Sequence, residues 1–216
     1  MNRIIRNILF ALALLALGGC SSAYYGTMEK VGIHKRDIMV DRVKAARDTQ
    51  NETKQQFVTA MEQFRSVVNF KGGDLEKEYN RLNATLKKSE SKASDVRNRI
   101  SAVEDVSEAL FDEWRAEIKQ YSNDSLRRSS QQKYDATRKK YTELIKAMKK
   151  AEARLEPVLI PLRDQVLFMK HNLNARAIAG LSSEVVSVQA NVDKLVKEME
   201  ASIAQADSFI RTLQSE

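Results

Sequence analysis

Residues 75–114 read LEKEYNRLNATLKKSESKASDVRNRISAVEDVSEALFDEW. In this stretch apolar and small side chains return at alternating spacings of three and four residues, which is the repeat of a helix that packs along one seam. The seam residues are Leu75, Tyr79, Leu82, Leu86, Ser89, Ala93, Val96, Ile100, Val103, Ser107, Leu110 and Trp114. The pattern continues to Ile118 or Tyr121, so the helix would be roughly 70 Å long. A seam of this length favours a coiled coil over an ordinary surface helix.

The same repeat occurs in three further segments, residues 34–67, 134–173 and 181–213. The seam residues of the first are Val43, Ala46, Gln50, Thr53, Phe57, Ala60, Phe64 and Val67. The composition agrees with long helices, since 30% of the residues are charged and only two prolines and seven glycines interrupt the chain. We therefore predict an all-α fold, an elongated antiparallel helical bundle or coiled coil of about four long helices.

Turn and capping residues separate the predicted helices. Gly72 and Gly73 end the first helix, and Asp74 is a suitable N-cap for the second. Residues 122–125, Ser-Asn-Asp-Ser, supply the next turn, and residues 180–184, Gly-Leu-Ser-Ser-Glu, supply a stop and a restart.

Pro157 and Pro161 lie inside the third predicted helix. Each removes a backbone hydrogen bond and crowds the preceding turn. The seam nevertheless keeps its phase across both prolines, so the sequence leaves open either one bent helix or two collinear ones.

The helix lengths and short connections predict how the helices are arranged. The first helix would lie beside the first three-quarters of the second, and the last helix beside the lower part of the third. This gives a four-helix body about 50 Å long, from which residues 112–138 project as a two-helix tip. The N-terminus would lie on the tip side of the body, and the loops at Gly72 and Gly180 would face away from it.

The first twenty residues have the parts of a bacterial lipoprotein signal. Arg3 and Arg6 precede a short apolar core at residues 8–17, and small residues lead to Cys20. The apolar run is shorter than the roughly 20 residues that span a bilayer. We therefore expect a signal peptide at residues 1–19, a lipidated N-terminus and linker at residues 20–33, and a single helical domain at residues 34–216.

Cys20 is the only cysteine of the chain, and acylation would account for its thiol. Several acyl chains make a stable anchor where one does not. Ser21 and Ser22 follow it, in place of the aspartate that holds enterobacterial-type lipoproteins in the inner membrane. We expect a protein that is lipid-anchored in the outer membrane and faces the periplasm.

The basic residues of the mature chain are concentrated in one segment. Residues 119–140 contain seven Lys or Arg and two Asp, a net charge of +5, and the rest of the mature chain sums to zero. The ordinary interpretation is a solvated helix face. The functional interpretation is that this tip binds an anionic surface, such as lipid head groups. The candidate residues are Arg127, Arg128, Lys133, Arg138, Lys139 and Lys140.

Motifs for catalysis or metal binding are scarce. His34 and His171 are isolated, and with Cys20 acylated no His and Cys residues have the spacing of a zinc site. No G-x-S-x-G, glycine-rich phosphate loop or H-E-x-x-H motif occurs. We expect no enzyme activity, no cofactor and no metal. Export also removes the reason to expect nucleic acid as a partner.

Two stretches carry a family resemblance. Residues 24–37, YYGTMEKVGIHKRD, and residues 155–165, LEPVLIPLRDQ, resemble an uncharacterised family of proteobacterial lipoproteins known as domain of unknown function 2959. The resemblance covers nearly all of the mature chain. It implies a Gram-negative host and an envelope location, and it supplies no activity or site residues.

Two classes of function remain. The first is a structural or adaptor lipoprotein that presents its rod to peptidoglycan, another envelope protein or anionic lipid. The second is a periplasmic chaperone-like or transport-accessory protein that holds apolar clients between its helices. A clasp needs an exposed apolar inner face, so the filled seams favour the rod. Unused stripe positions leave room for a homo-oligomer.

Overall fold

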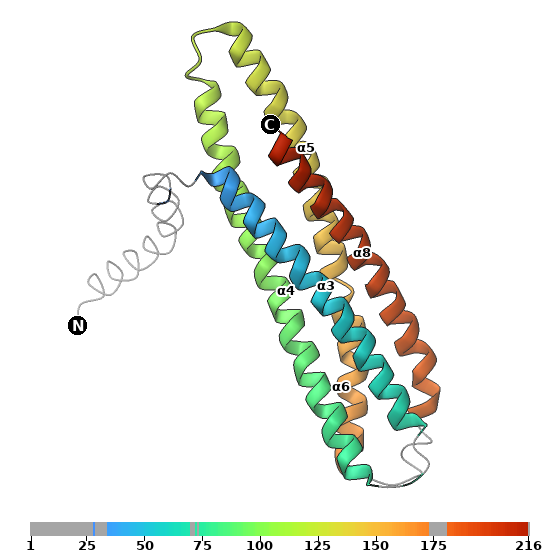
Figure 1. Cartoon of the computed structure of the whole chain (residues 1–216). Coiled ribbons are helices and arrows are strands. Elements are labelled where there is room, and N and C mark those ends of the chain that lie inside the picture. The colour runs from blue at the N-terminus through green and yellow to red at the C-terminus, as the bar shows by residue number, and fades with distance from the viewer. Residues whose placement is uncertain (1–27, 29–33, 70–71, 73, 173–180, 216) are drawn as a thin grey trace, which may run out of the picture.

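The computed structural model describes residues 28, 34–69, 72, 74–172 and 181–215. Long helices pack side by side into an elongated antiparallel bundle (Figure 1). They are α3 (Lys35–Val68), α4 (Leu75–Ile118), α5 (Asp124–Glu152), α6 (Leu155–His171) and α8 (Val185–Ser215), which follows the 3-10 turn η1 (Ser182–Glu184). The described residues contain no strand. The predicted all-α bundle of about four long helices is confirmed, with the third helix divided into α5 and α6.

The predicted capping residues begin two of the helices. One carboxylate oxygen of Asp74 accepts a hydrogen bond from the backbone N–H of Lys77 at 3.1 Å. The side-chain oxygen of Asn123 accepts from the N–H groups of Ser125 and Leu126, at 2.9 and 3.1 Å. Between α3 and α4, Gly72 has a φ of 138°, a conformation that favours glycine. Local chemistry therefore sets these helix ends.

The third predicted helix is interrupted at Ala153 and Arg154, and not at the prolines themselves. Pro157 falls in the first turn of α6, where its missing N–H needs no partner. Its ring would crowd the carbonyl of Ala153 in a continuous helix, so the ladder ends at that residue. Figure 1 shows that α5 and α6 follow one another along one side of the bundle. Of the two alternatives, the structure has two successive helices.

The helices form a ring in which each packs mainly against two antiparallel neighbours. Helix α3 packs against α4 and α8. Helices α5 and α6 pack against the same two helices. The predicted seam of α3 is buried along its whole length, from Val43 to Val67. In the second seam, Ile118 is buried whereas 39% of Tyr121 is exposed, so Ile118 is the residue that continues the core.

The core is wider than the predicted seams. Additional buried side chains are Ile38, Met39, Val40, Gln56, Met61, Val106, Phe111, Leu159, Ser202 and Ile210. A helix that contacts two neighbours buries a face of at least about 100° and not a narrow line of residues. The coiled-coil pattern therefore identified the centre of each buried face and missed its edges.

Two polar contacts mark where the four-helix body ends and the tip begins. The ammonium group of Lys35, at the start of α3, lies 2.8 Å from a carboxylate oxygen of Glu113 on α4. The ammonium group of Lys140 on α5 donates to the hydroxyl of Thr212, near the end of α8, at 2.7 Å. Beyond these contacts α4 and α5 continue alone, as Figure 1 shows. This matches the predicted tip at residues 112–138. The described start of α3 lies on the tip side and Gly72 at the opposite end, while Gly180 lies outside the described residues.

Candidate functional site

The predicted lipidation residue, Cys20, lies outside the described residues, so its acylation stays a prediction. His34 is exposed directly before α3, and His171 is exposed as the last residue of α6 at the other end of the body. Among the described residues, no three His, Cys, Asp or Glu side chains are grouped so that they could hold a metal ion. In the same part of the chain, no helix has the length and apolar character needed to cross a bilayer.

The six candidate cations of the tip are all exposed, but they do not form one flat patch. Arg127 pairs with Asp124 at 2.5 Å, and the guanidinium carbon of Arg138 lies 4.9 Å from the centre of the Phe111 ring on α4. Lys140 contacts α8 through Thr212, and Lys133 lines a groove. The cations therefore lie on several sides of α5, which forms one of the two arms of the tip; α4 forms the other. Arg128 and Lys139 are the remaining two candidates.

The positions of these cations along the helix divide them into two groups. Arg127 and Arg128 lie within the first turns of α5, close to the end of the tip. Lys139 and Lys140 lie about 20 Å further along the helix axis, where the four-helix body begins. A surface met by the end of the tip would reach only the first group.

The other arm of the tip is acidic. Residues 112–118 on α4 contain three acidic side chains and one basic one, so the whole tip, residues 112–138, carries a net charge of only +1. Asp112 pairs with Arg115, and Glu113 with Lys35. The predicted basic tip is thus a polarised one, with its positive charge on α5.

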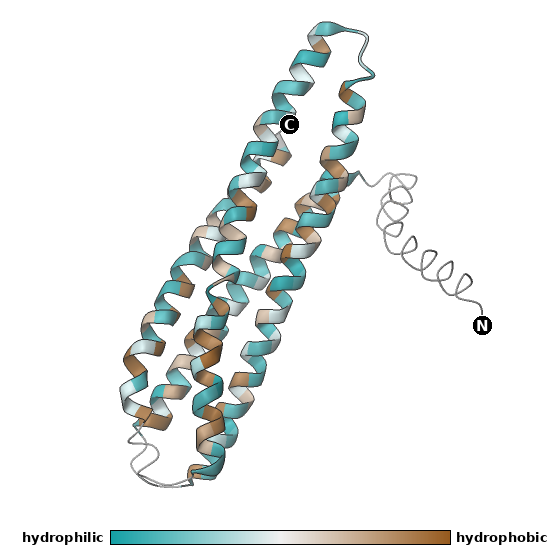
Figure 2. Ribbon diagram, turned by 180° about the vertical axis from the view of Figure 1, so that it is seen from behind, coloured by the Kyte–Doolittle hydropathy of each residue, from teal (hydrophilic) through white to brown (hydrophobic). Residues whose placement is uncertain are grey.

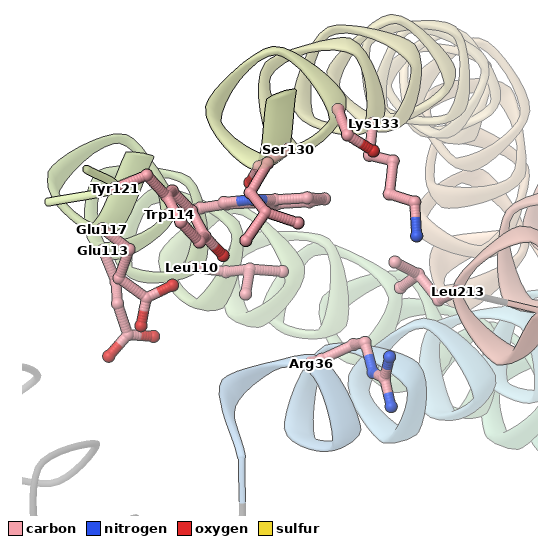
Figure 3. Close-up of a pocket in the computed structure, with 11 residues that line it drawn as sticks. Arg36, Leu110, Glu113, Trp114, Glu117, Tyr121, Ser130, Lys133 and Leu213 are labelled. Carbon is pink, nitrogen blue, oxygen red and sulfur yellow. The ribbon is translucent and has the colours of Figure 1, made fainter. Parts of the chain in front are cut away.

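A groove of about 380 Å³ lies between the two arms, beside the start of α3 and the end of α8 (Figure 3). Trp114 lies between the arms, where its indole N–H donates to the hydroxyl of Ser130 at 2.9 Å. Tyr121 and Leu126 also line the groove, and they remain 39% and 56% exposed. Arg36 from α3 and Lys133 from α5 add two cations. The groove is therefore an amphipathic surface.

Aromatic side chains hold the two arms together below the groove. The ring of Tyr134 contacts those of Phe111 and Trp114 edge to face, with centres 5.6 and 5.7 Å apart. Tyr141 bridges Phe111 and Phe209 of α8, and burial raises the pKa of its hydroxyl despite a hydrogen bond with Ser107. Tyr134 is buried, and the predicted seam residue Trp114 is half-buried.

Sequence reasoning missed the groove because its residues come from four helices. Arg36, Trp114, Leu126 and Leu213 are far apart in the sequence, and the fold brings them together. One signal was available: Leu126 lies off the seam, as an isolated apolar residue among polar neighbours in residues 122–133.

A second exposed apolar region lies at the opposite end of the body. Ile160, Leu167 and Phe168 on α6 are 51%, 61% and 45% exposed. Figure 2 shows that hydrophobic residues run along much of this helix. Phe168 also borders a shallow groove against Leu181 and Glu184.

Comparison with known proteins gives a family and no relative of established activity. No curated protein matches the chain. A family model described as "Protein of unknown function (DUF2959)" matches residues 24–213, a range that includes both stretches on which the resemblance was based. Because the match extends over most of its length, the protein belongs to this family.

Proposed function

We propose that this protein is a structural or adaptor lipoprotein of the cell envelope, anchored by Cys20 in the outer membrane and facing the periplasm. The observation that carries the proposal is the closed, elongated body whose first helix starts at one end. A lipid attached upstream of α3 would hold the rod by that end. The other end, about 65 Å from the end of the tip, would then be presented away from the membrane.

The closed interior supports a rod and argues against the chaperone-like alternative. All four sides of the ring contribute fully buried side chains to the core, among them Phe57, Ile100, Leu144 and Leu195. A clasp for unfolded clients would need a contiguous apolar inner surface open to solvent. In the described body that surface is already occupied by the packing of one helix on another.

Ion pairs tie the ring together on its outer surface as well. They include Arg47 with Asp207 between α3 and α8, Lys92 with Glu52 between α4 and α3, and Lys150 with Glu198 between α5 and α8. Each such pair contributes only about 0–1 kcal/mol, but together they favour one alignment of the helices. A fixed alignment suits a spacer that presents a defined surface to peptidoglycan, to an envelope protein or to lipid.

The anchor is tested on the full precursor expressed in a Gram-negative host. We expect the mature protein to begin at an acylated Cys20, by mass spectrometry, and to fractionate with the outer membrane. Cys20→Ser should block acylation and cleavage, whereas Ser22→Ala, the matched control, should leave both unchanged. An unmodified thiol in the native product would overturn the proposal.

The adaptor role is tested by photo-crosslinking in the intact envelope. A crosslinker placed at the exposed position Leu167, at the end away from the tip, should capture a defined envelope component. Purified protein should not suppress aggregation of an unfolded outer-membrane protein. Strong suppression with no defined crosslink would replace the adaptor by the chaperone-like function.

A further inference from the structure

The end of the tip, residues 119–128, joins α4 to α5 and is called the apex below. It exposes two apolar side chains, Tyr121 at 39% and Leu126 at 56%. Both line the groove that contains Trp114, so the apolar surface of the apex continues between the arms. These two side chains are not part of the buried core, since Ile118 is the last buried residue of the α4 seam.

The apex is also the part of the tip with a clear excess of positive charge. Lys119, Arg127 and Arg128 are exposed there, against the single acid Asp124, for a net charge of +2. Arg127 pairs with Asp124 within one turn of exposed helix. Such surface pairs are weak, so the guanidinium can exchange this partner for another anion.

The apex lies near the place where the chain enters the body. Lys35 contacts Glu113, and α4 ends five residues later at Ile118, so the apex begins about 8 Å past the start of α3. The fourteen residues that precede His34, from Cys20 on, could span about 45 Å when extended. A lipid on Cys20 therefore leaves the apex free to reach the same membrane.

We propose that the apex is a second membrane contact, in which Leu126 and Tyr121 enter the head-group region and Lys119, Arg127 and Arg128 bind phosphates of anionic phospholipid. This deepens the proposed function and rests on it for the identity of the membrane. Aromatic and basic side chains together are typical of a protein surface at the membrane interface. With two points of attachment, the rod would keep a fixed orientation to the bilayer.

A bilayer fits this surface better than a protein partner does. A specific protein interface buries about 800 Å² on each side, far more than two side chains at the end of a helical hairpin supply. A lipid surface adapts its shape to a narrow, convex apex, and each Lys or Arg near it adds favourable electrostatic energy.

The test uses residues 21–216, which contain the whole described body and no cysteine. Because no acyl chain is present, the result does not depend on whether Cys20 is acylated in the cell. The chain is sedimented with vesicles of phosphatidylcholine alone, or of phosphatidylcholine with about 30% phosphatidylglycerol. We expect binding to the anionic vesicles only, and its loss at high salt.

Two matched pairs of variants locate the contact. Lys119→Gln/Arg127→Gln/Arg128→Gln should lower partitioning by about tenfold or more, whereas Lys77→Gln/Lys87→Gln/Lys88→Gln, three exposed cations near the other end of α4, should not. Leu126→Ser should also weaken binding, and Leu167→Ser on α6 should not. Equal effects of tip and control variants would overturn the proposal, as would equal binding to both kinds of vesicle.

Insertion is measured separately from binding. An environment-sensitive dye on Leu126→Cys should shift to the blue on anionic vesicles, and the same dye on Leu167→Cys should not shift. Free glycerol phosphate should fail to produce the shift or to compete at millimolar concentration, since the site is a lipid surface. Binding without a shift at position 126, or a shift with soluble phosphate alone, would contradict the proposed contact.

Discussion

The hydroxyl of Ser202 on α8 donates a hydrogen bond to the side-chain oxygen of Gln50 on α3, at 2.8 Å, in the interior of the bundle. Neither residue is exposed. The amide nitrogen of Gln50 has no hydrogen-bond partner within the protein. Nearby on α3, the amide nitrogen of Gln56 donates to Ser89 of α4 at 3.2 Å. These polar pairs connect α3 to both neighbours at fixed heights, where an apolar seam alone would allow sliding.

The first prediction concerns the Gln50–Ser202 pair. Ser202→Ala should lower the free energy of unfolding by about 1–2 kcal/mol, because it leaves a buried acceptor unsatisfied. Gln50→Leu/Ser202→Ala should restore or exceed the original value, since no unpaired polar atom then remains. Urea unfolding measures both. A neutral Ser202→Ala would show that the hydrogen bond contributes nothing to stability.

The second prediction concerns Pro161, which has no N–H and so leaves the carbonyl of Pro157 without its helical partner. That carbonyl accepts a hydrogen bond from the side-chain amide of Asn191 on α8, at 3.1 Å. Asn191→Ala should destabilise the protein by about 0.5–1.5 kcal/mol. In a Pro161→Ala background the same change should lower the free energy of unfolding much less, because an N–H at position 161 can donate a hydrogen bond to the carbonyl of Pro157.

A double-mutant cycle of Asn191→Ala and Pro161→Ala, followed by thermal or urea unfolding, measures this coupling. Additive effects of the two substitutions would mean that proline and asparagine act independently. Asn191 would then be a surface residue with no link to the irregular helix opposite.

The third prediction concerns the acid side of the stability profile. Arg97 on α4 donates to Glu156 on α6 at 2.7 Å, and Arg163 donates to it at 3.2 Å. The hydrogen bond from Arg97, followed by that from Arg163, lowers the pKa of Glu156 below 4.5. A lowered pKa in the folded protein means that the stabilisation is present above the unfolded value and is lost as the pH falls through the folded one.

A cycle of Arg97→Gln and Glu156→Gln should therefore show favourable coupling at pH 7 that disappears well below pH 4.5. The Glu156→Gln variant should be less stable than the natural chain at pH 7, and this difference in the free energy of unfolding should disappear over the same pH range. Coupling that persists in acid would have to come from packing of the side chains and not from their charges.

The fourth prediction concerns the core. Ile100→Ala on α4 should lower the free energy of unfolding by about 2–5 kcal/mol, since the side chain is fully buried and its removal leaves a cavity. Leu167→Ala, at a position 61% exposed, is the control and should change stability by less than about 0.5 kcal/mol. Similar losses at both positions would indicate that α6 is covered by another surface in solution, such as a second copy of the chain.

Much of the fold could be predicted because the packing of a long helical bundle repeats every three or four residues along each helix. The alternation of three and four residues identified Val43, Phe57 and Ile100 as seam residues, and all three are buried. Asp74 and residues 122–125 marked the helix starts through side chains that bond their own backbone. The break before α6 was foreseen less well, since a proline exerts its effect four residues upstream.

The candidate site was predictable only in part. The tip itself followed from helix lengths, but the charge count over residues 119–140 omitted the acidic arm that the fold places opposite. The groove required Arg36, Trp114, Leu126 and Leu213 to meet, and no local pattern connects them.

By itself, the sequence determined the helices, their seams and the turns between them, because these depend on interactions within a few residues. Tertiary structure alone decided which side chains share a surface. Ring closure buried the edges of each helix face, paired Gln50 with Ser202, and left Tyr121 and Leu126 exposed beside the arginines of α5. The physical reason is that burial and electrostatic contact depend on distance in space, which only the assembled bundle defines.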